Sequence, residues 1–462
     1  MDSILDISNF QKFLKDEEEI IIDEFLRKYI INFRKIEDEE SQKIENFFTL
    51  IIKYICSGDI KSATSIYKDL IDYNIELDIP YIMLTYELIN LKKIIMEKLI
   101  YKDVRDELMQ LYKLHLFFED MIAKTYLNKY IVDLNKKNNF SLSNLSGISQ
   151  SNIIYYYKMH LEWLEDLAKA IVLADINIFP EINHNLCTFG KWLDKEGLEI
   201  IKNSSKYKNI SKLHENLHFF AKQIKNCLIE TQGNNHIILI YLEKCEMISL
   251  SLGTELALID NTLINSEASK DPLTGALNRQ RLSQLYQNQL EISFATFEPF
   301  VIAMCDFDHF KNINDTFGHL AGDKMLKSFV HIAKKHLRTS DIIIRYGGEE
   351  FMIILPAINT KKAKDILNKI REDIANFVLN LDGNKISATI SIGMIEIYPE
   401  NGNNSYFKDF ENTISLVDKK LYEAKNSGRN TICWYLFSPN LVLAKISIFY
   451  YWEYFIIGSK NG

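Results

Sequence analysis

The chain has 462 residues, and 47% of them are hydrophobic, so it is long enough for about three domains with cores of their own. The formal net charge of -8 argues against a nucleic-acid-binding protein, because that class usually presents a basic domain or stripe to the phosphates. The six cysteines are far apart and show no paired spacing, which is typical of reduced thiols in a cytoplasmic protein; they are Cys56, Cys187, Cys227, Cys245, Cys305 and Cys433.

We expect neither end of the chain to hold a targeting or membrane-spanning segment. Residues 1–19 carry acidic side chains where a signal peptide would be basic, and they lack an apolar stretch. The tail of residues 437–462 is apolar and aromatic, but Lys445 and Glu453 interrupt it. A membrane span needs about 20 largely uncharged residues, so we expect this tail to pack against the protein or to form an extension.

The first half of the chain has the pattern of helices. From Phe10 to Leu134 apolar residues recur at spacings of three and four, with one glycine and one proline. We therefore predict an all-helical domain over residues 1–135, an input or dimerisation unit without a recognisable ligand motif. The segment 136–152 is rich in Asn, Ser and Lys, and this composition predicts a linker. A second helical stretch follows over residues 153–227.

A long helix is predicted from His236 to Asn265, after the break at residues 233–235. Its apolar residues alternate at spacings of four and three, which is typical of a parallel two-stranded coiled coil. The seam consists of Ile238, Leu242, Cys245, Ser249, Leu252, Leu256, Ile259 and Leu263. We assign residues 236–268 to a coiled-coil signalling helix.

From Asp271 onward the pattern changes to alternating strands and helices, which predicts an α/β domain with a mixed sheet over residues 269–436. The expected strands are 300–305, 388–393 and 431–435, together with a hairpin formed by 342–344 and 352–355. The expected helices are 321–337, 360–380 and 414–427, and residues 306–323 are expected to form a loop after the first strand.

The hairpin tip, Arg345-Tyr346-Gly347-Gly348-Glu349-Glu350-Phe351, combines two glycines with two acids. Glycines allow positive φ and a close approach of a ligand, and carboxylates are the hard oxygen ligands that Mg²⁺ prefers. The pattern predicts a metal and phosphate site.

This tip is identified as the signature of the GGDEF-domain diguanylate cyclases, in its GGEEF form. The resemblance covers residues 271 to about 434, and its motifs occur in the family's order. They are the opening Asp271-Pro272-Leu273-Thr274-Gly275-Ala276-Leu277-Asn278-Arg279, then Asp306-Phe307-Asp308-His309-Phe310-Lys311-Asn312-Ile313-Asn314-Asp315, then Gly318-His319 and Gly322-Asp323. The resemblance implies condensation of two GTP molecules into cyclic di-GMP by a homodimer.

The resemblance also implies roles for individual residues. Asp306, Phe307, Glu349 and Glu350 would hold two Mg²⁺ or Mn²⁺ ions, with Glu350 as a further ligand or as general base. Lys311, Lys425 and Arg429 would contact phosphates, Gly347 and Gly348 would lie against the substrate, and Asn314 with Asp323 would bind guanine. Arg338-Thr339-Ser340-Asp341 resembles the RxxD inhibitory site for the product, and a surface ion pair at a helix end is the alternative.

A second group of residues has metal-ligand chemistry. His214 and His218 form an i, i+4 pair on one predicted helix, and Cys187 lies at equal intervals from His160 and His214. Cys187-Thr188-Phe189-Gly190-Lys191-Trp192-Leu193 resembles the signature of the chemoreceptor zinc-binding domain. The resemblance implies a four-helix bundle over residues 150–232 with a regulatory Zn²⁺ bound by His160, Cys187, His214 and His218. A lone histidine such as His115 or His184 is expected to be inert.

The combined prediction is a multidomain protein: an all-α N-terminal unit, a zinc-binding bundle, a coiled coil and an α/β GGDEF domain. We expect a cytoplasmic, homodimeric diguanylate cyclase whose activity is restrained by zinc and by product, with no nucleic-acid polymer or membrane as partner. Two alternatives remain: a catalytically silent GGDEF receptor that binds cyclic di-GMP, and a zinc buffer or zinc-responsive adaptor whose cyclase output is incidental.

Overall fold

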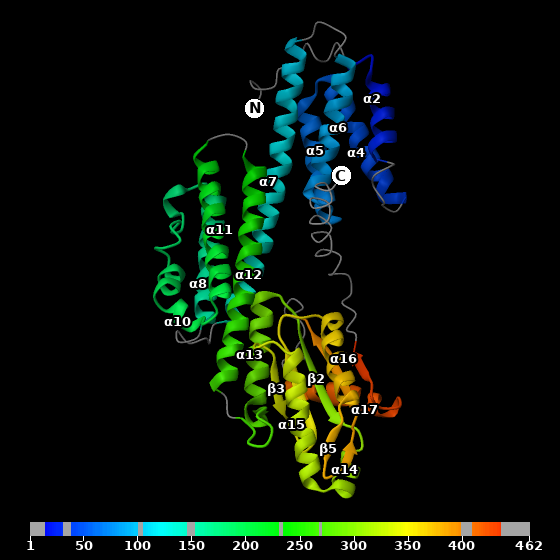
Figure 1. Ribbon diagram of the computed structural model, residues 1–462. Coiled ribbons are helices and arrows are strands. Elements are labelled where there is room, and N and C mark those ends of the chain that lie inside the picture. Colours follow the sequence, from blue (N-terminus) through cyan, green and yellow to red (C-terminus); the bar gives the residue numbers. More distant parts are fainter. Residues whose placement is uncertain are drawn as a thin grey trace, which may run out of the picture. The chain divides into compact units, whose positions relative to one another are not determined.

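The structure is a computed structural model, and it describes residues 14–30, 38–99, 105–145, 153–230, 234–267, 270–398 and 409–435 (Figure 1). The apolar tail, residues 437–462, lies outside the described residues, as do residues 146–152 of the predicted linker. The chain divides into two compact units, residues 1–138, 162–195 and 211–248, and residues 139–161, 196–210 and 249–462. Within the described ranges, no helix has both the length and the apolarity needed to cross a membrane.

The N-terminal region is helical, as predicted. Its elements are α2 (Glu18–Phe25), η1 (Leu26–Ile30), α4 (Asp38–Ser57), α5 (Ile60–Glu76), α6 (Tyr81–Leu99) and α7 (Arg105–Asn144). Their apolar faces form one core, in which the Tyr67 and Phe118 rings are 4.5 Å apart. His115 is buried on α7, and burial lowers its pKa to about 4. The linker predicted from residue 136 is wrong as far as residue 144, because α7 continues through these polar residues.

The next helices are α8 (Ile154–Leu173), α9 (Thr188–Trp192), α10 (Leu198–Ile200), α11 (Ser204–Ile229) and α12 (Asn235–Glu267), with the short turns η2 (Ile176–Ile178) and η3 (Leu193–Gly197). Between η2 and α9 the chain is irregular. Side-chain and backbone hydrogen bonds hold this segment: the Trp163 indole donates to the Glu181 carbonyl at 2.9 Å, and Asp175 caps η2. The described part of residues 150–232 is therefore helical with one long connection.

Helix α12 is close to the predicted bounds, and the apolar residues of its predicted seam are buried. Ile238, Leu242, Cys245, Ser249, Leu252, Leu256 and Ile259 are all buried within one chain. The physical reason is that α12 is apolar on several faces, since Leu239 and Ala257 beside the seam are buried as well. A helix with apolar residues on several faces packs into a core, and pairing of this helix with a second chain stays a prediction.

The C-terminal part is an α/β domain with a mixed sheet, as predicted. Six strands form one sheet in the order β1-β3-β4-β2-β7-β8, parallel at its two ends and antiparallel in the middle. They are β1 (Leu277–Asn278), β2 (Phe300–Phe307), β3 (Ile342–Arg345), β4 (Glu350–Leu355), β7 (Ile390–Ile397) and β8 (Ile432–Tyr435). The helices are η4 (Arg279–Arg281), α13 (Leu282–Thr296), α14 (Phe310–Phe317), α15 (His319–His336), α16 (Thr360–Asn376) and α17 (Phe410–Asn426).

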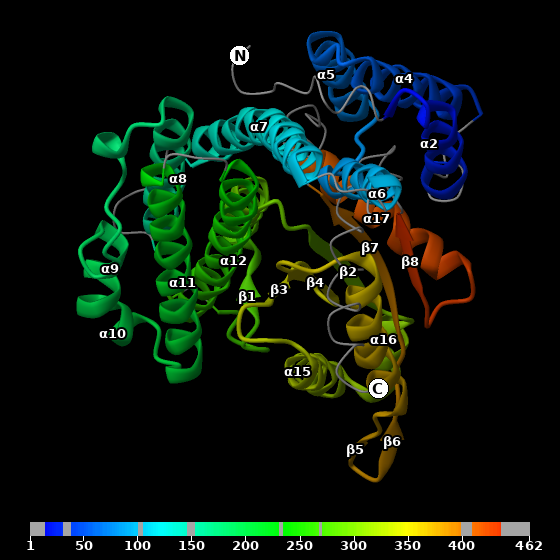
Figure 2. The same cartoon turned by 90° about the horizontal axis from the view of Figure 1, so that it is seen from above.

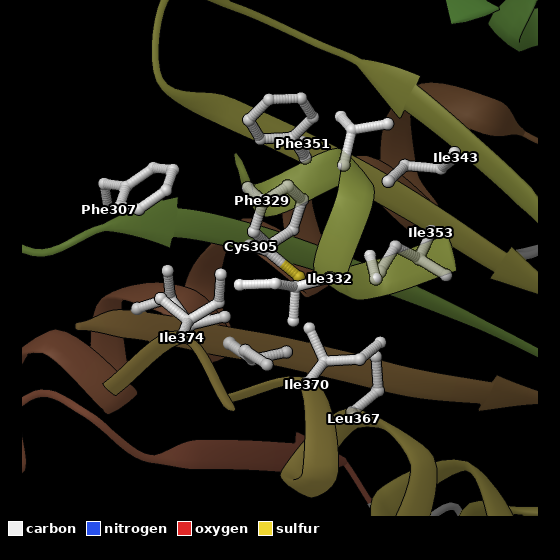
Figure 3. Close-up of a cluster of buried hydrophobic side chains, with 14 of the residues drawn as sticks. Cys305, Phe307, Phe329, Ile332, Ile343, Phe351, Ile353, Leu367, Ile370 and Ile374 are labelled. Atoms are coloured by element: carbon white, nitrogen blue, oxygen red, sulfur yellow. The ribbon is translucent and has the colours of Figure 1, made fainter. Parts of the chain in front are cut away.

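Strand β2 is buried along its whole length, and its residues alternate between two cores. Cys305 and Phe307 face a core shared with Phe329 of α15 and Ile370 of α16 (Figure 3). Phe300, Ile302 and Met304 face the other core, which includes residues of α13 and α17. The alternation follows from the period of two in a strand, and it assigns Asp306 to the α17 side.

Three details of this domain differ from the sequence prediction. The helix expected over 360–380 ends at Asn376, and β5 (Leu379–Leu381) and β6 (Asn384–Ile386) form a small hairpin of their own (Figure 2). Residues 310–317, expected in a loop, form α14. Helix α13 was not predicted, although its apolar side chains fill the second core. Turn residues such as Asp382-Gly383, both at positive φ, explain why the chain reverses there.

The contact of α17 with β7 gives a stability prediction. A Cβ at Gly393 would lie 2.1 Å from the Leu421 nitrogen and 2.5 Å from the Val417 oxygen, both backbone atoms that cannot rotate away. We expect Gly393→Ala to lower the free energy of unfolding of this domain by about 2–3 kcal/mol, because overpacking forces the helix from the sheet. Hydrogen exchange of the sheet amides at increasing urea concentration measures this free energy of unfolding.

The matched control is Gly348→Ala, because a Cβ at Gly348 would meet nothing within 4 Å. Its stability should stay within about 0.5 kcal/mol of the wild type. Equal stability of the two variants would contradict the close approach of α17 to β7.

Candidate functional site

The end of β2 carries the central acid of the predicted catalytic site. Asp306 is paired in register with Glu350, the first residue of β4, and both belong to the α17 side of the sheet. Lys425 of α17 lies there too, with its Nζ 2.8 Å from Asp306 Oδ1. A predicted metal ligand, a predicted ligand or base, and a predicted phosphate contact are therefore brought together from three separate elements.

The carboxylates at this point influence one another. Burial raises the pKa of Asp306, while the hydrogen bond from Lys425 lowers it. Burial also raises the pKa of Glu349 and Glu350, and the Asp306 charge adds to both shifts. Three partly buried acids with one lysine leave an excess of negative charge, which is the environment that a divalent cation neutralises. The donor set fits Mg²⁺ or Mn²⁺, with hard oxygen ligands from Asp306, Glu349 and Glu350.

The two hairpin glycines act differently from the expectation. Neither Gly347 nor Gly348 is among the glycines with positive φ in the described chain, so that expected conformation is wrong. A Cβ at Gly347 would lie 2.6 Å from Glu350 Oε2. The backbone N–H groups of Tyr346 and Gly347 donate to the Glu350 carbonyl at 2.9 and 3.2 Å. The missing side chain of Gly347 therefore leaves room for the Glu350 carboxylate in this position.

An ion pair that the sequence analysis did not single out holds this hairpin. Arg345 Nη1 lies 3.2 Å from Asp271 Oδ1, and Arg345 Nη2 donates to the Gly348 carbonyl at 2.8 Å. Asp271 also accepts hydrogen bonds from the backbone N–H and the hydroxyl of Thr274. The opening motif of the domain thus fixes the hairpin tip. The available signal was an arginine at the start of the tip, Arg345, together with an acid at the start of the opening motif, Asp271.

The residues predicted to bind guanine lie on the two helices after β2. Asn314 belongs to α14, and Asp323 belongs to α15 directly after Gly322. A Cβ at Gly322 would lie 2.1 Å from Asn314 Oδ1, so the Asn314 amide lies against the α15 backbone beside Asp323. Lys311 and Arg429, the remaining predicted phosphate contacts, are exposed at the surface.

The Arg338–Asp341 segment forms a tight turn between α15 and β3. The backbone N–H of Arg338 donates to Asp341 Oδ2 at 2.7 Å, and the N–H of Asp341 donates to the Arg338 carbonyl at 3.1 Å. Asp341 is buried, and burial raises its pKa against the effect of that hydrogen bond. Arg338 itself is exposed. The carboxylate therefore stabilises the turn through the backbone of Arg338, while the arginine side chain is presented to solvent.

The structure brings the four predicted zinc ligands together. One ligand atom each of His160, Cys187, His214 and His218 lies within 4.8 Å of all the others. His160 comes from α8, Cys187 precedes α9, and both other histidines come from α11. Cys187 Sγ is 3.1 Å from His214 Nε2. Three imidazoles and one thiolate at this spacing suit a closed tetrahedral Zn²⁺ site.

Backbone contacts orient these ligands. His218 Nδ1 lies 2.9 Å from the Ile182 carbonyl, and His160 Nδ1 lies 3.2 Å from the Tyr156 carbonyl. An imidazole that donates from Nδ1 to a carbonyl presents Nε2 to a metal, which is the usual arrangement of structural histidine ligands. Burial lowers the pKa of His218 to about 4, so this ring is neutral at neutral pH, as a metal ligand must be.

Cys187 is held at the start of a short helix. Its Sγ accepts a hydrogen bond from the Gly190 N–H at 3.2 Å, and this contact lowers the pKa of the thiol, which burial raises. A Cβ at Gly190 would lie 1.8 Å from the His184 carbonyl oxygen. The connecting segment therefore passes directly over α9. It also places the His184 ring 6.1 Å from that of His214, a proximity that the sequence analysis did not predict.

Comparison with protein families agrees with both sites. Residues 268–431 match the family described as "Diguanylate cyclase, GGDEF domain", and residues 160–225 match the chemoreceptor zinc-binding domain. The first range contains the carboxylates and the hairpin, and the second contains the His/Cys group.

Several characterised proteins are similar to parts of the chain. Diguanylate cyclase DgcZ of Escherichia coli is 27% identical over 289 residues, which cover 61% of this chain and 92% of that protein. Diguanylate cyclase DgcP of Pseudomonas aeruginosa is 38% identical over 166 residues, 36% of this chain and 24% of that protein. Diguanylate cyclase A of Treponema denticola is 41% identical over 138 residues, which cover 29% of this chain and 35% of that protein. The chain thus spans about a quarter to a third of the last two proteins. Residues 268–431 therefore match the GGDEF domain family, and the residues before them match the chemoreceptor zinc-binding domain.

Proposed function

We propose that the protein is a homodimeric diguanylate cyclase that condenses two GTP molecules into cyclic di-GMP and two pyrophosphates. The observation that carries this proposal is the convergence of Asp306, Glu350 and Lys425 at the end of β2, beside a hairpin whose Gly347 leaves room for the Glu350 carboxylate. Relatives named as diguanylate cyclases match the same part of the chain.

The chemistry assigned to these residues is nucleotidyl transfer. The 3′-hydroxyl of each GTP attacks the α-phosphorus of the other, the bond to pyrophosphate breaks, and the hydroxyl proton passes to a base, for which we propose Glu350. Bound divalent cations would neutralise the triphosphate and lower the pKa of that hydroxyl. Asp306, the Phe307 backbone and Glu349 complete the proposed ligand set. Lys311, Lys425 and Arg429 would bind phosphates, and Asn314 with Asp323 would bind guanine through paired polar groups.

The proposed reaction needs two copies of the domain. Each chain binds one GTP, and the two 3′-hydroxyls face opposite α-phosphates only when two domains meet antiparallel. Catalysis therefore depends on the relative pose of the two domains, because misplacing the reacting atoms by about 1 Å can cost on the order of a hundredfold in rate. Any change upstream that alters this pose regulates the enzyme.

Zinc is the proposed upstream signal. The buried donor set of His160, Cys187, His214 and His218 supports Zn²⁺ binding, and its four ligands leave no open position for catalysis. We propose that bound zinc holds the zinc-binding domain in a conformation that keeps the cyclase inactive. Because α12 begins directly after this domain and runs toward the first residues of the cyclase domain, it is the proposed connection.

Product is the second proposed regulator. Arg338 is exposed at the turn before β3, where its guanidinium is available for a phosphate or the guanine edge of cyclic di-GMP. Asp341 shapes the same turn. We propose that cyclic di-GMP binds there and restrains the domains in an unproductive arrangement.

The first test measures cyclic di-GMP formed from GTP and Mg²⁺ by purified protein and by Glu350→Gln. Product is expected from the wild type and a loss of at least about a hundredfold from the variant, because the base or metal ligand is removed. Asp365→Asn, an exposed position on α16, is the matched control.

Retention of GTP binding by Glu350→Gln would show that the variant has lost the catalytic step and not substrate binding. If the wild type formed no product but bound cyclic di-GMP, the protein would be a receptor and the proposed activity wrong.

A second test removes two zinc ligands. We expect the His214→Ala, His218→Ala double variant to lose bound zinc and to show higher, chelator-independent cyclase activity, since two of four ligands are gone. Metal analysis of the purified protein and activity with and without a strong chelator measure this.

His184→Ala is the matched control, because His184 lies beside the site without being one of the four ligands. It should keep its zinc. Unchanged zinc content in the double variant would contradict the site, whereas zinc loss without any change in rate would contradict only the regulation and favour a zinc buffer.

A third test concerns the product. Arg338→Ala should raise the concentration of cyclic di-GMP needed for half inhibition by about ten- to a hundredfold, because charge-assisted hydrogen bonds are lost. The turn itself should persist, because the variant keeps the Arg338 backbone N–H that donates to Asp341. Lys335→Ala on the neighbouring turn of α15 is the control, and unaltered inhibition of Arg338→Ala would refute the site.

A further inference from the structure

The turn between α17 and β8 has an unusual backbone. Gly428, Arg429 and Asn430 have φ values of 106°, 63° and 45°. Positive φ is ordinary for glycine but disfavoured for residues with a side chain. Two such residues in succession persist only when their surroundings hold them, and such turns concentrate at functional sites. Here the middle residue is Arg429, a proposed phosphate contact.

Asp308 holds this turn. Its Oδ2 accepts hydrogen bonds from the Asn430 N–H at 3.0 Å and from the Thr389 hydroxyl at 2.6 Å, and its Oδ1 accepts one from the Ser391 hydroxyl at 2.7 Å. The backbone N–H of Asp308 also donates to the Thr389 carbonyl at 2.8 Å. The carboxylate is 6% exposed. A buried charge with three donors is well satisfied and fixes the geometry of its donors.

Arg371 of α16 holds the same residue from another direction. Its Nη1 donates to the Asn430 carbonyl at 3.2 Å and to Asn430 Oδ1 at 2.8 Å. The N–H, the carbonyl and the side chain of Asn430 are therefore all engaged. The Arg429 N–H donates to the Ala424 carbonyl at 3.2 Å, which joins the turn to the last turn of α17. The Arg429 side chain is exposed.

We propose that Asp308 is a positioning residue that fixes Arg429 for the triphosphate of GTP, with Arg371 as a second support. Asp308 follows the proposed metal ligand Asp306 by two residues, so one short segment sets the metal site and the phosphate-binding turn relative to each other. A guanidinium held in place loses less conformational entropy on binding than one on a free loop. The inference rests on the proposed function, because it is the proposed function that assigns Arg429 to the phosphates of GTP.

The test is a double-mutant cycle with Asp308→Asn and Arg429→Ala, measured first as affinity for a fluorescent GTP analogue and then as KM and kcat. Asn keeps the shape of Asp308 but replaces one acceptor oxygen by a donor NH₂ group. The turn therefore loses part of the hydrogen bonding that holds it. We expect each single variant to weaken nucleotide binding about tenfold, with KM changing more than kcat. In the Arg429→Ala background, Asp308→Asn should add no further weakening, because Asp308 acts through Arg429.

A purely structural role predicts a different result. A partly unfolded variant has fewer active molecules, which lowers kcat and leaves KM unchanged. Independent, multiplying effects on affinity in the cycle would overturn the proposal. If Asp308→Asn does not fold, Arg371→Gln takes its place in the same cycle, with the same expectation of non-additivity.

Asp365→Asn on the exposed face of α16 is the matched control and should bind nucleotide as the wild type does. Two failures can be distinguished. Nucleotide binding without coupling between the two positions would overturn the positioning role alone. Absence of nucleotide binding by the wild type would overturn the proposed function and this inference together.

Discussion

Burial of strand β2 on both faces is the constraint on which the catalytic half of the protein depends. Apolar side chains alternate between two helical layers until the strand reaches Asp306, where the pattern places a carboxylate at the edge of the α17 layer. The strand cannot slip by one residue without exchanging its two cores. The position of Asp306 is therefore set by hydrophobic packing, and Lys425 and Glu350 meet it because their elements pack on the same strand.

Charged side chains with several hydrogen bonds then fix the segments that hydrophobic packing has brought together. Asp271 and Arg345 hold the hairpin tip, and Asp308 holds the turn that carries Arg429. Each anchor is a charged group with several charge-assisted hydrogen bonds, which are stronger and more directional than neutral ones. Both lie next to residues of the proposed chemistry. The catalytic site is thus held from two sides, by the opening motif of the domain and by the segment after β2.

The His/Cys group is also positioned by packed elements, which in this case are helices. α8 and α11 supply imidazoles from their buried faces, while the irregular segment between them supplies the thiol and the carbonyl of Ile182 that orients His218. Such a group has a geometry that a metal would stabilise. A regulatory role for it is consistent with its closed donor set, which is unlike the open coordination of a catalytic zinc.

The sequence by itself determined the fold class and the main strands and helices, and it predicted the residues proposed for catalysis, because periodicity and motifs are local properties of the chain. It also predicted the His/Cys group from spacing and resemblance. Tertiary structure alone decided which apolar faces meet: the α12 seam is buried within the chain, α7 runs through a polar stretch, and Gly347 provides space and not positive φ. The distant partners of Asp308 and Arg345 were equally hidden, because hydrogen bonds across 74 to 122 positions depend on packing that no local pattern encodes.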